Sequence, residues 1–443
     1  MINIKEHEKC CGCGACVQRC PHQCITMKED EEGFLYPFVD ETSCIDCGLC
    51  EKVCHELHPY ERRKPLNLYA AMNKDDEVRE HSSSGGIFHM LAEKTLRKGG
   101  VVFGARFDEE WQVVIDSAET IEEVMPFLGS KYVQARTEDA FRKAEDFLKQ
   151  GRHVLFSGTP CQIAGLHHFL RKEYDNLITV DFVCHGVPSP LVWRRYLKEV
   201  TQNVHHINEI HFRNKKDGWK RFCLDLKYDR DNQTVEVSSF HGVNHFMRAF
   251  LSDMILRPSC HNCKAKEGRS LSDITIADFW GVNIEMPEMD DDKGTSLLIV
   301  NTEKGKEYID WERMKWKETE LETVRKYNAG LSASTIPHHR REVFFKKLMS
   351  TESITTHIDD MLRPTFISRM RIKLGRIRRE LLANLKAKKR TGGDKTKEYL
   401  NTSQELPDTL LSADRLYVSD ISFRNKEKGW KEYRMTIKLK EQE

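Results

Sequence analysis

The sequence predicts a protein of mixed α+β and α/β structure in three parts: a cysteine-rich N-terminal module, a layered α/β domain and a basic helical C-terminal region. Three observations predict this architecture. A four-cysteine spacing occurs twice near the N-terminus. Helical segments then alternate with apolar, β-branched runs. Lys and Arg accumulate between residues 365 and 390. The 443 residues are enough for several domains with buried cores.

The N-terminal module contains two copies of the spacing C-x2-C-x2-C-x3-C, which is typical of bacterial proteins that hold 4Fe–4S clusters. In the two-cluster arrangement, the fourth cysteine of each copy binds the cluster held by the other copy. The predicted ligands of one cluster are Cys10, Cys13, Cys16 and Cys54. The predicted ligands of the other cluster are Cys44, Cys47, Cys50 and Cys20. We therefore interpret residues 1–60 as a ferredoxin-type module with two 4Fe–4S clusters.

Zinc is the alternative occupant of these cysteines. Structural zinc sites usually combine two C-x2-C pairs, whereas each copy here has three closely spaced cysteines and a fourth. This pattern favours iron–sulfur clusters. The C-x3-C-x2-C spacing of radical-SAM proteins does not occur, since Met27 stands where its last cysteine would be. Cys11 and Cys24 fall outside both copies, and we expect them to be small buried residues beside the clusters.

The layered α/β domain is predicted over residues 67–330. A strand at 68–75 is followed by a serine-capped helix over 81–100 that ends at Gly99 and Gly100. A buried strand follows at 101–107. Residues 141–172 are typical of a helix, a strand, a loop and a helix, and residues 176–190 of a further strand and loop. Helices that alternate with β-branched strands predict a layered sheet.

Four cysteines of this domain suggest a third cluster. Cys161 and Cys184 each follow the C-terminal end of a predicted strand, which is the edge where ligands bind in open α/β sheets. Cys260 and Cys263 form a C-x2-C pair. Four thiolates suffice for one 4Fe–4S cluster. The alternative is that Cys161 and Cys184 merely pack at the strand ends, and the residues alone leave both interpretations open.

The C-terminal part divides into a helical region at 331–390 and a linker plus hairpin at 391–443. Apolar residues recur at helical spacing within the basic stretch 365–390. A docked helix with a solvated basic face is favoured over a helix that binds an anionic surface. The hairpin sequence "SFRNKEKGWKEYRMTIKLK" repeats the motif of residues 211–229, "HFRNKKDGWKRFCLDLKYD".

Composition excludes several classes of protein. The formal net charge is +1, so the whole chain gives no indication of nucleic-acid binding. We find no apolar run long enough to span a membrane and no signal peptide, which predicts a cytoplasmic protein. The cysteines are then expected to bind metal or to act in redox chemistry rather than to form disulfides. A homo-oligomer is compatible with all of this.

Seven segments together resemble a known family. They are "HSSSGGIF", "GSKYVQA", "VLFSGTPCQIAGL", "DFVCHGVPSP", "FRNKKDGW", "LRPSCHNCK" and "SDITIADFWG". In this order they resemble the family of coenzyme factor-420 hydrogenase and dehydrogenase β subunits, over about residues 1 to 350. The resemblance implies an FAD-binding α/β domain with its own 4Fe–4S cluster, which favours the third set of cysteines. It also implies flavin contacts from Ser83, Ser84, Gly85, Gly86, Ser130, Lys131, Gly158, Thr159 and Pro160.

We interpret the protein as an iron–sulfur flavoprotein oxidoreductase. Electrons would enter through the N-terminal 4Fe–4S clusters from a redox partner such as a ferredoxin or a reductase. They would pass through the third cluster to FAD and on to a small organic substrate. His185, beside Cys184, is the predicted proton donor, and a hydrogen-bonded loop histidine is its alternative. The alternative function is a non-catalytic electron-transfer subunit that relays electrons to a partner enzyme.

Overall fold

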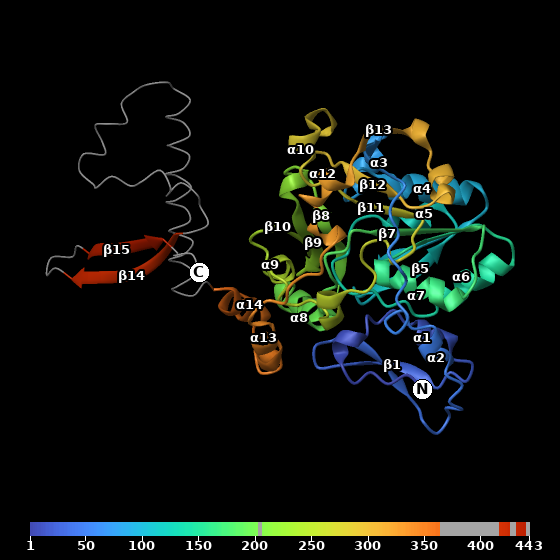
Figure 1. Cartoon of the computed structure of the whole chain (residues 1–443), viewed down its shortest axis with the longest axis horizontal. Helices are drawn as coiled ribbons and strands as arrows, with labels where there is room; N and C mark the ends of the chain where they lie inside the picture. The colour runs from blue at the N-terminus through green and yellow to red at the C-terminus, as the bar shows by residue number, and fades with distance from the viewer. Residues whose placement is uncertain (203–205, 364–415, 426–430, 440–443) are drawn as a thin grey trace. The chain divides into compact units, whose positions relative to one another are not determined.

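The computed structural model describes residues 1–202, 206–363, 416–425 and 431–439. The chain forms two compact units, Met1–Arg363 and Pro364–Glu443, and each is described by itself. The predicted basic stretch at 365–390 and the start of the predicted linker lie outside the described residues. Helices and strands both occur throughout the first unit, so the prediction of mixed α and β structure is confirmed (Figure 1).

The N-terminal module consists of two short helices and a hairpin. Helices α1 (Ala15–Arg19) and α2 (Leu49–Lys52) each begin directly after a glycine with positive φ, Gly14 at 75° and Gly48 at 68°. Any residue with a side chain would be strained there. The same turn therefore begins both helices, in keeping with the repeated cysteine spacing. The antiparallel strands between the helices are β1 (Ile25–Glu29) and β2 (Leu35–Val39).

An eight-stranded sheet forms the centre of the α/β domain, in the order β13-β3-β12-β11-β7-β6-β4-β5. The neighbours β4, β6, β7 and β11 are parallel, and the other neighbouring pairs are antiparallel. Parallel neighbours bring their C-terminal ends to one edge, where ligand sites form. The strands are β3 (Asn67–Asn73), β4 (Val101–Phe107), β5 (Val113–Ala118), β6 (Val154–Ser157), β7 (Leu177–Phe182), β11 (Ile274–Asp278), β12 (Ser296–Val300) and β13 (Met314–Thr319).

Helices cover both faces of this sheet. On one face, Phe103 and Phe156 belong to the same buried cluster as side chains of α6 and α7. On the other face, Val102 and Leu155 cluster with side chains of α4. Successive side chains of a strand point to opposite faces, so a strand covered on both faces is a continuous apolar run. The helices are α4 (Ile87–Arg97), α6 (Ala140–Lys149) and α7 (Pro160–Leu170).

The start of α4 corrects one prediction. The sequence predicts a serine cap, but α4 begins after Gly86, whose φ is 77° and which provides no side-chain cap. The serines precede the helix instead, in the connection from α3 (Asp76–His81). Gly85 explains why the helix starts late: a Cβ atom there would lie 2.5 Å from the carbonyl oxygen of Ala71 in β3. The backbone must pass this strand before the helix can begin.

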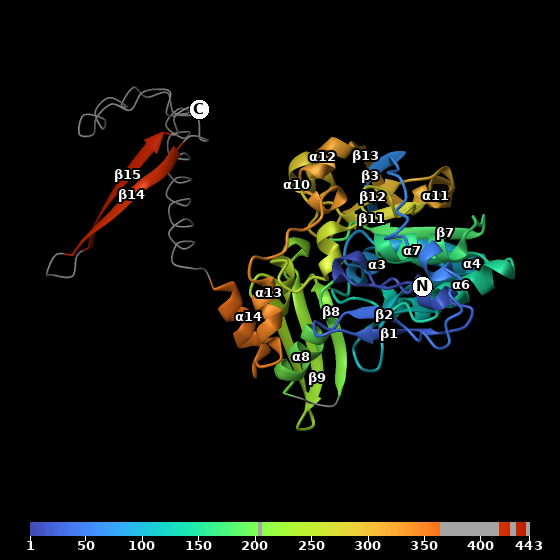
Figure 2. The same ribbon diagram turned by 60° about the horizontal axis from the view of Figure 1, so that its bottom comes forward.

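A second sheet, β10-β9-β8, packs beside helices α8 and α9 (Figure 1), and Figure 2 shows its strands β8 and β9 next to α8. Its apolar side chains share a buried cluster with α8, and the ring centroids of Phe212 and Trp193 are 4.9 Å apart. The strands are β8 (Ile207–Asn214), β9 (Cys223–Arg230) and β10 (Gln233–Phe240). The remaining helices are α5 (Ile121–Val124), α8 (Pro190–Val200), α9 (His245–Leu251), α10 (Val282–Glu285), α11 (Glu303–Tyr308), α12 (Leu321–Arg325), α13 (Arg341–Leu348) and α14 (Ile354–Leu362).

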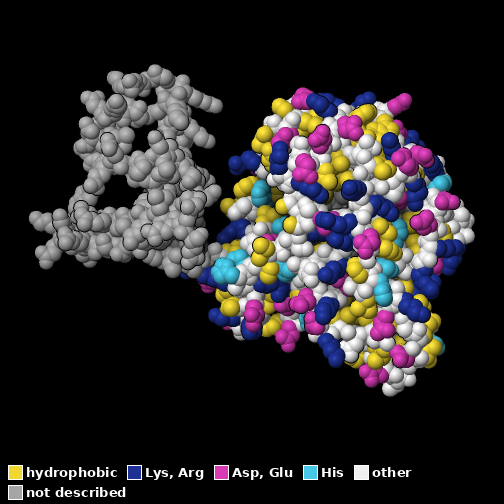
Figure 3. All heavy atoms as spheres, in the orientation of Figure 1, with side chains coloured by type: hydrophobic (Ala, Val, Ile, Leu, Met, Phe, Trp, Pro, Cys, Tyr) yellow, Lys and Arg dark blue, Asp and Glu magenta, His cyan; other side chains and the backbone are white. Residues whose placement is uncertain are grey.

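The second unit contains an antiparallel pair of strands, β14 (Leu416–Asn425) and β15 (Lys431–Leu439). These strands coincide with the predicted hairpin, whose turn lies outside the described residues. Across the described part of the chain, no helix is both long and apolar enough to cross a bilayer. On the face shown in Figure 3, acidic and basic side chains of the described residues are interspersed.

Candidate functional site

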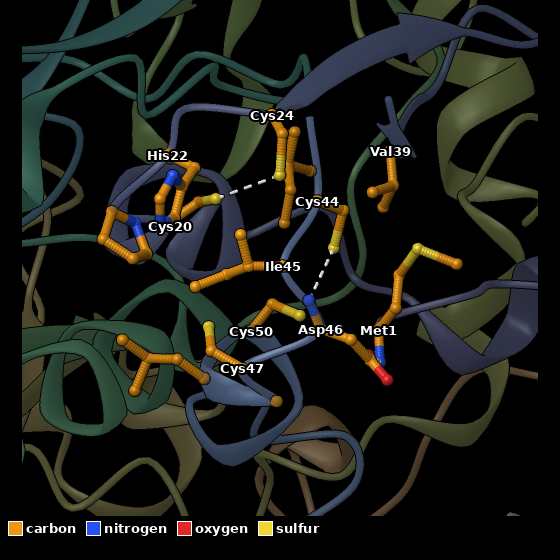
Figure 4. A pocket seen from close by; sticks show the side chains of 14 residues that line it. Met1, Cys20, His22, Cys24, Val39, Cys44, Ile45, Asp46, Cys47 and Cys50 are labelled. Atoms are coloured by element: carbon orange, nitrogen blue, oxygen red, sulfur yellow. Dashed lines mark hydrogen bonds and ion pairs between the residues drawn. The ribbon is translucent and has the colours of Figure 1, made fainter. Parts of the chain in front are cut away.

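The first group of cysteines, called here the outer group, is Cys20, Cys44, Cys47 and Cys50. These residues line one cavity of the N-terminal module, and Figure 4 shows their side chains around a common space. Cys47 is exposed. Backbone N–H groups already point at two of the sulfurs: Asp46 N lies 3.4 Å from Cys44 Sγ, and Ile2 N lies 3.3 Å from Cys50 Sγ. Such N–H···S contacts are part of how a protein tunes a cluster.

The inner group is Cys10, Cys13, Cys16 and Cys54, which line a second cavity of the same module. The structure thus brings together the first three cysteines of each copy with the fourth of the other, as the spacing predicts. The burial of Cys10 raises its thiol pKa, and the nearby Arg257 opposes that increase. Burial also raises the pKa of Cys16 well above its usual value. A bound metal must therefore displace protons from these thiols.

Cys11 and Cys24 are both buried, as expected, but neither is remote from the sulfurs. Cys24 Sγ lies 3.4 Å from Cys20 Sγ in the outer group. Cys11 Sγ lies 3.1 Å from His55 Nε2. Hydrogen bonds with the thiols of Cys13 and Cys161 raise the pKa of the Cys11 thiol well above its usual value. Cys11 therefore lies where the inner group faces the α/β domain.

The third group is Cys161, Cys184, Cys260 and Cys263. Cys161 lies in the first turn of α7, directly beyond β6, and Cys184 follows β7, so parallel strands bring both to one edge of the sheet. The other two lie in and after the short helical turn Pro258–Asn262. Gly186, two residues after Cys184, lies against this turn, because a Cβ atom there would be 3.3 Å from Cys260 Cβ. Burial raises the pKa of Cys184, and negative charge on the other three cysteines raises it further. Val187 N points at Cys260 Sγ from 3.4 Å.

The inner and third groups meet across α7. A Cβ atom at Gly165 would lie 2.9 Å from Cys13 Sγ, so only glycine leaves room for this thiol against the helix. Gly165 lies about one turn after Cys161 on α7. The Cys11 thiol lies beside both groups, since a hydrogen bond with it lowers the pKa of Cys161 to about 7 against the effect of burial. The two groups are therefore neighbours.

A cavity of about 950 Å³ lies beside the second sheet. Of the residues predicted to contact flavin, Ser83, Ser130 and Lys131 line it. Ser83 Oγ accepts hydrogen bonds from Ser130 N at 2.7 Å and from Ser130 Oγ at 2.9 Å. The cavity falls within the size range typical of small-molecule and cofactor sites. The residues that line it are therefore compatible with a flavin nucleotide.

The other predicted flavin contacts do not line this cavity. They are Ser84, Gly85, Gly86, Gly158, Thr159 and Pro160. Gly85 N donates to Ser296 Oγ at 2.9 Å, so this amide already has a partner. Thr159 caps α7, and its hydroxyl lies 3.1 Å from Cys161 Sγ. Thr159 thus lies beside the third cysteine group and away from the cavity. Ser84 Oγ is buried without a hydrogen-bond partner among the described residues.

His185 also lies away from the cavity. Its Nε2 is 2.7 Å from Asp253 Oδ1, and its ring meets Phe250 edge-on at 5.2 Å between centroids. The His185 ring is thus hydrogen-bonded to a carboxylate. This contact fits the alternative interpretation of His185, a hydrogen-bonded loop histidine, better than the proton donor.

Three cationic side chains line the cavity: the buried Arg213 and the half-buried Lys131 and Lys215, of which the sequence had singled out only Lys131. Arg213 donates to Asp278 Oδ2 at 2.6 Å and to Tyr132 OH at 3.1 Å. Burial lowers the pKa of Lys131 to about 7 and that of Lys215 to about 8. Acidic residues such as Asp292 also line the cavity, so its lining carries both signs of charge and is not uniformly positive. The repeated "FRNK" motif, which contains Arg213, was the signal that could have identified it.

Three family models match the chain. Residues 9–56 match the 4Fe-4S dicluster domain, which contains the outer and inner cysteine groups. Residues 68–142 match the N-terminal part of the coenzyme F420 hydrogenase/dehydrogenase β subunit, and residues 151–326 match its C-terminal part. The second of these two ranges contains all four cysteines of the third group. The N-terminal module thus binds 4Fe–4S clusters.

Two relatives have related descriptions. The chain is 23% identical over 304 residues to the coenzyme F420-dependent sulfite reductase of Methanocaldococcus jannaschii, an alignment that covers 67% of this chain and 45% of the reductase. It is 27% identical over 337 residues to an F(420)H(2) dehydrogenase subunit of Methanosarcina mazei, covering 71% of this chain and 85% of that protein. The chain therefore spans less than half of the reductase but most of the dehydrogenase subunit.

A solved structure of the F420-reducing [NiFe] hydrogenase complex from Methanosarcina barkeri also resembles the chain. The similarity covers 66% of this chain and 95% of that chain, with 16% identity and a TM-score of 0.42.

Proposed function

Because the chain belongs to the family of coenzyme F420 hydrogenase/dehydrogenase β subunits and contains a 4Fe–4S dicluster domain, we propose that it is an electron-transfer subunit of an oxidoreductase complex. In this role it relays electrons between a redox partner and a partner enzyme through three 4Fe–4S clusters. The observation that supports this most directly is the arrangement of three four-cysteine groups, one of them reaching the protein surface.

The order of the relay follows from exposure and contact. Cys47 of the outer group is exposed, so this group is the one that a partner protein can approach. The inner group comes next, and Cys13 contacts α7 at Gly165, about one turn from Cys161 of the third group. When bound, 4Fe–4S clusters supply one-electron chemistry over a wide range of potentials. The protein holds the thiolates, excludes water from the inner positions and keeps the groups adjacent.

A second candidate function adds a two-electron site, and the cavity of about 950 Å³ favours it. We propose FAD as its ligand, with the seryl hydroxyls of Ser83 and Ser130 and the Lys131 ammonium as contacts. A cationic lysine offsets phosphate charge or stabilises a reduced flavin. In that case the chain is an enzyme in its own right and transfers an electron pair to a small organic substrate.

Anaerobic purification with quantitation of iron, sulfide and flavin tests these proposals. The relay predicts about twelve irons per chain, four for each cluster. Reduction with dithionite, followed by addition of candidate partner proteins or substrates, separates the two functions. A relay reduces the cofactor of a partner protein, whereas an enzyme turns over a small substrate alone. About eight irons or fewer in the anaerobic protein would contradict both, because each function includes three clusters.

A further inference from the structure

Arg257 connects two cysteine groups that belong to different parts of the chain. The residue lies three positions before Cys260 of the third group, and Cys260 N donates to the Arg257 carbonyl at 3.0 Å. Its side chain reaches into the N-terminal module, where Nε donates to the carbonyl oxygen of Cys10 at 2.8 Å. One residue therefore contacts the loop of the inner group through its side chain and the loop of the third group through its backbone.

The guanidinium is held from several sides. Nη2 donates to the Leu35 carbonyl at 2.9 Å, and Nη1 donates to Gln134 Oε1 at 2.9 Å. Gln134 Nε2 in turn donates to the Cys11 carbonyl at 3.1 Å. The guanidinium carbon also lies 4.2 Å from the ring centroid of Tyr36. These contacts together fix the position and the plane of the guanidinium group.

Gly12 leaves space for the Arg257 guanidinium. A Cβ atom at this position would lie 2.7 Å from Gln134 Nε2 and 3.0 Å from Arg257 Nη1. The φ of Gly12 is also positive, at 72°. The glycine between Cys10 and Cys13 is thus shaped to receive a side chain from the other domain, in addition to its role in the cysteine loop.

Arg257 is 0% exposed, yet its side-chain hydrogen bonds among the described residues go to two carbonyls and an amide, and none goes to a carboxylate. A buried cation without a counter-charge is costly, and such charges are normally paired or bound to a metal centre. Its neighbours are neutral carbonyls, an amide and aromatic faces. The ionisable groups that act on Arg257 include Cys10 of the inner group and Cys260 of the third group, together with Cys11 and Tyr36. Glu56, which lines the inner cavity, also feels this charge but makes no ion pair with it. A cluster held by four thiolates is anionic, and net charge is one determinant of its potential.

We propose that Arg257 is a positioning residue between the inner and third clusters, which fixes their separation and whose buried charge raises the reduction potential of both. This inference rests on the proposed function. The positive charge stabilises the more negative, reduced state of each neighbouring cluster, so it favours electrons on the inner part of the relay. The outer-group cysteines make no contact with the Arg257 side chain among the described residues, so we expect this charge to shift the potential of their cluster least.

The test uses the anaerobically purified full chain with its clusters and measures three midpoint potentials by redox titration with low-temperature EPR. Arg257→Gln removes the positive charge. Arg257→Lys keeps the charge but loses the planar guanidinium and its set of hydrogen bonds. Arg79→Gln is the matched control, because Arg79 is also buried, at 3% exposed, but pairs with Asp291. We expect two of the three potentials to become more negative in Arg257→Gln, to stay near wild type in Arg257→Lys, and not to move in Arg79→Gln.

Two results would overturn the proposal. One is an Arg257→Gln protein that keeps its irons and all three potentials. The other is a loss of irons from both Arg257 variants, which would make Arg257 a purely structural residue. Failure of the proposed function looks different, because the wild-type protein itself would then lack three clusters or would fail to reduce a partner.

Discussion

Replacing Asp278 by Asn should destabilise the first unit strongly. Asp278 is the carboxylate partner of Arg213, and the two side chains are 14% and 3% exposed. Asn keeps the shape and one acceptor oxygen, so Trp219 Nε1, now 3.2 Å from Asp278 Oδ1, can retain its hydrogen bond. What is lost is the negative charge, and the guanidinium stays buried without compensation.

The magnitude follows from the burial of the pair. Removing one partner of a buried ion pair costs about 3–5 kcal/mol. Unfolding entropy is about 2.1 cal/mol/K per residue, so a unit as long as Met1–Arg363 has roughly 0.8 kcal/mol/K. We therefore expect the Asp278→Asn protein to melt about 4–7 °C below wild type if the unit unfolds cooperatively.

Thermal melting followed by tryptophan fluorescence is a suitable assay, because Trp219 stacks on Trp280 at 5.0 Å beside this ion pair. Two further variants serve as controls. The double variant Arg213→Met/Asp278→Leu removes both charges and should melt closer to wild type than Asp278→Asn. Glu288→Gln disrupts an exposed pair with Lys317 and should have little effect. A melting point within about 1 °C of wild type for Asp278→Asn would refute the reasoning.

Three other predictions concern the thiols, the cavity and the response to acid. Cys13→Ser should lose about four irons per chain, whereas Cys11→Ser should keep the wild-type iron content, as measured by colorimetric iron assay; equal losses would place Cys11 among the ligands. Because burial lowers the pKa of Lys131 to about 7, its ammonium is lost as the pH rises through that value. FAD should therefore bind more weakly at pH 8.5 than at pH 6 in a fluorescence titration, and Lys131→Met should abolish this difference; an unchanged pH dependence would contradict the assignment. Burial also lowers the pKa of His168 to about 4, so the unfolded chain binds the proton more tightly and stability is lost as the pH falls from about 6.5 towards 4. His168→Phe should keep the stacking on Tyr60, which lies 4.2 Å away between centroids, and lessen the fall in melting temperature; a fall as steep as that of wild type would be the contrary result.

The sequence by itself determined those features that depend on short spacings. Residues two or three positions apart must lie on one loop or one helical turn, so the repeated cysteine spacing predicted both ligand sets of the module, including their crossed arrangement. The alternation of helical and β-branched segments predicted the layered sheet for the same reason, since it depends on local periodicity. The resemblance to a family favoured the third cysteine set, which the residues alone had left open, and added a list of flavin contacts.

Only the tertiary structure decided which distant residues meet. Arg257 and Cys10 are far apart in sequence, and no local pattern connects a buried arginine to the carbonyl that it contacts. The predicted flavin contacts divide among the cavity, the segment before α4 and the start of α7, where folding uses Thr159 as a helix cap. The predicted serine cap of α4 failed because the backbone at Gly85 must first pass β3. Each of these outcomes depends on burial against a remote segment, and a one-dimensional pattern contains no information about that contact.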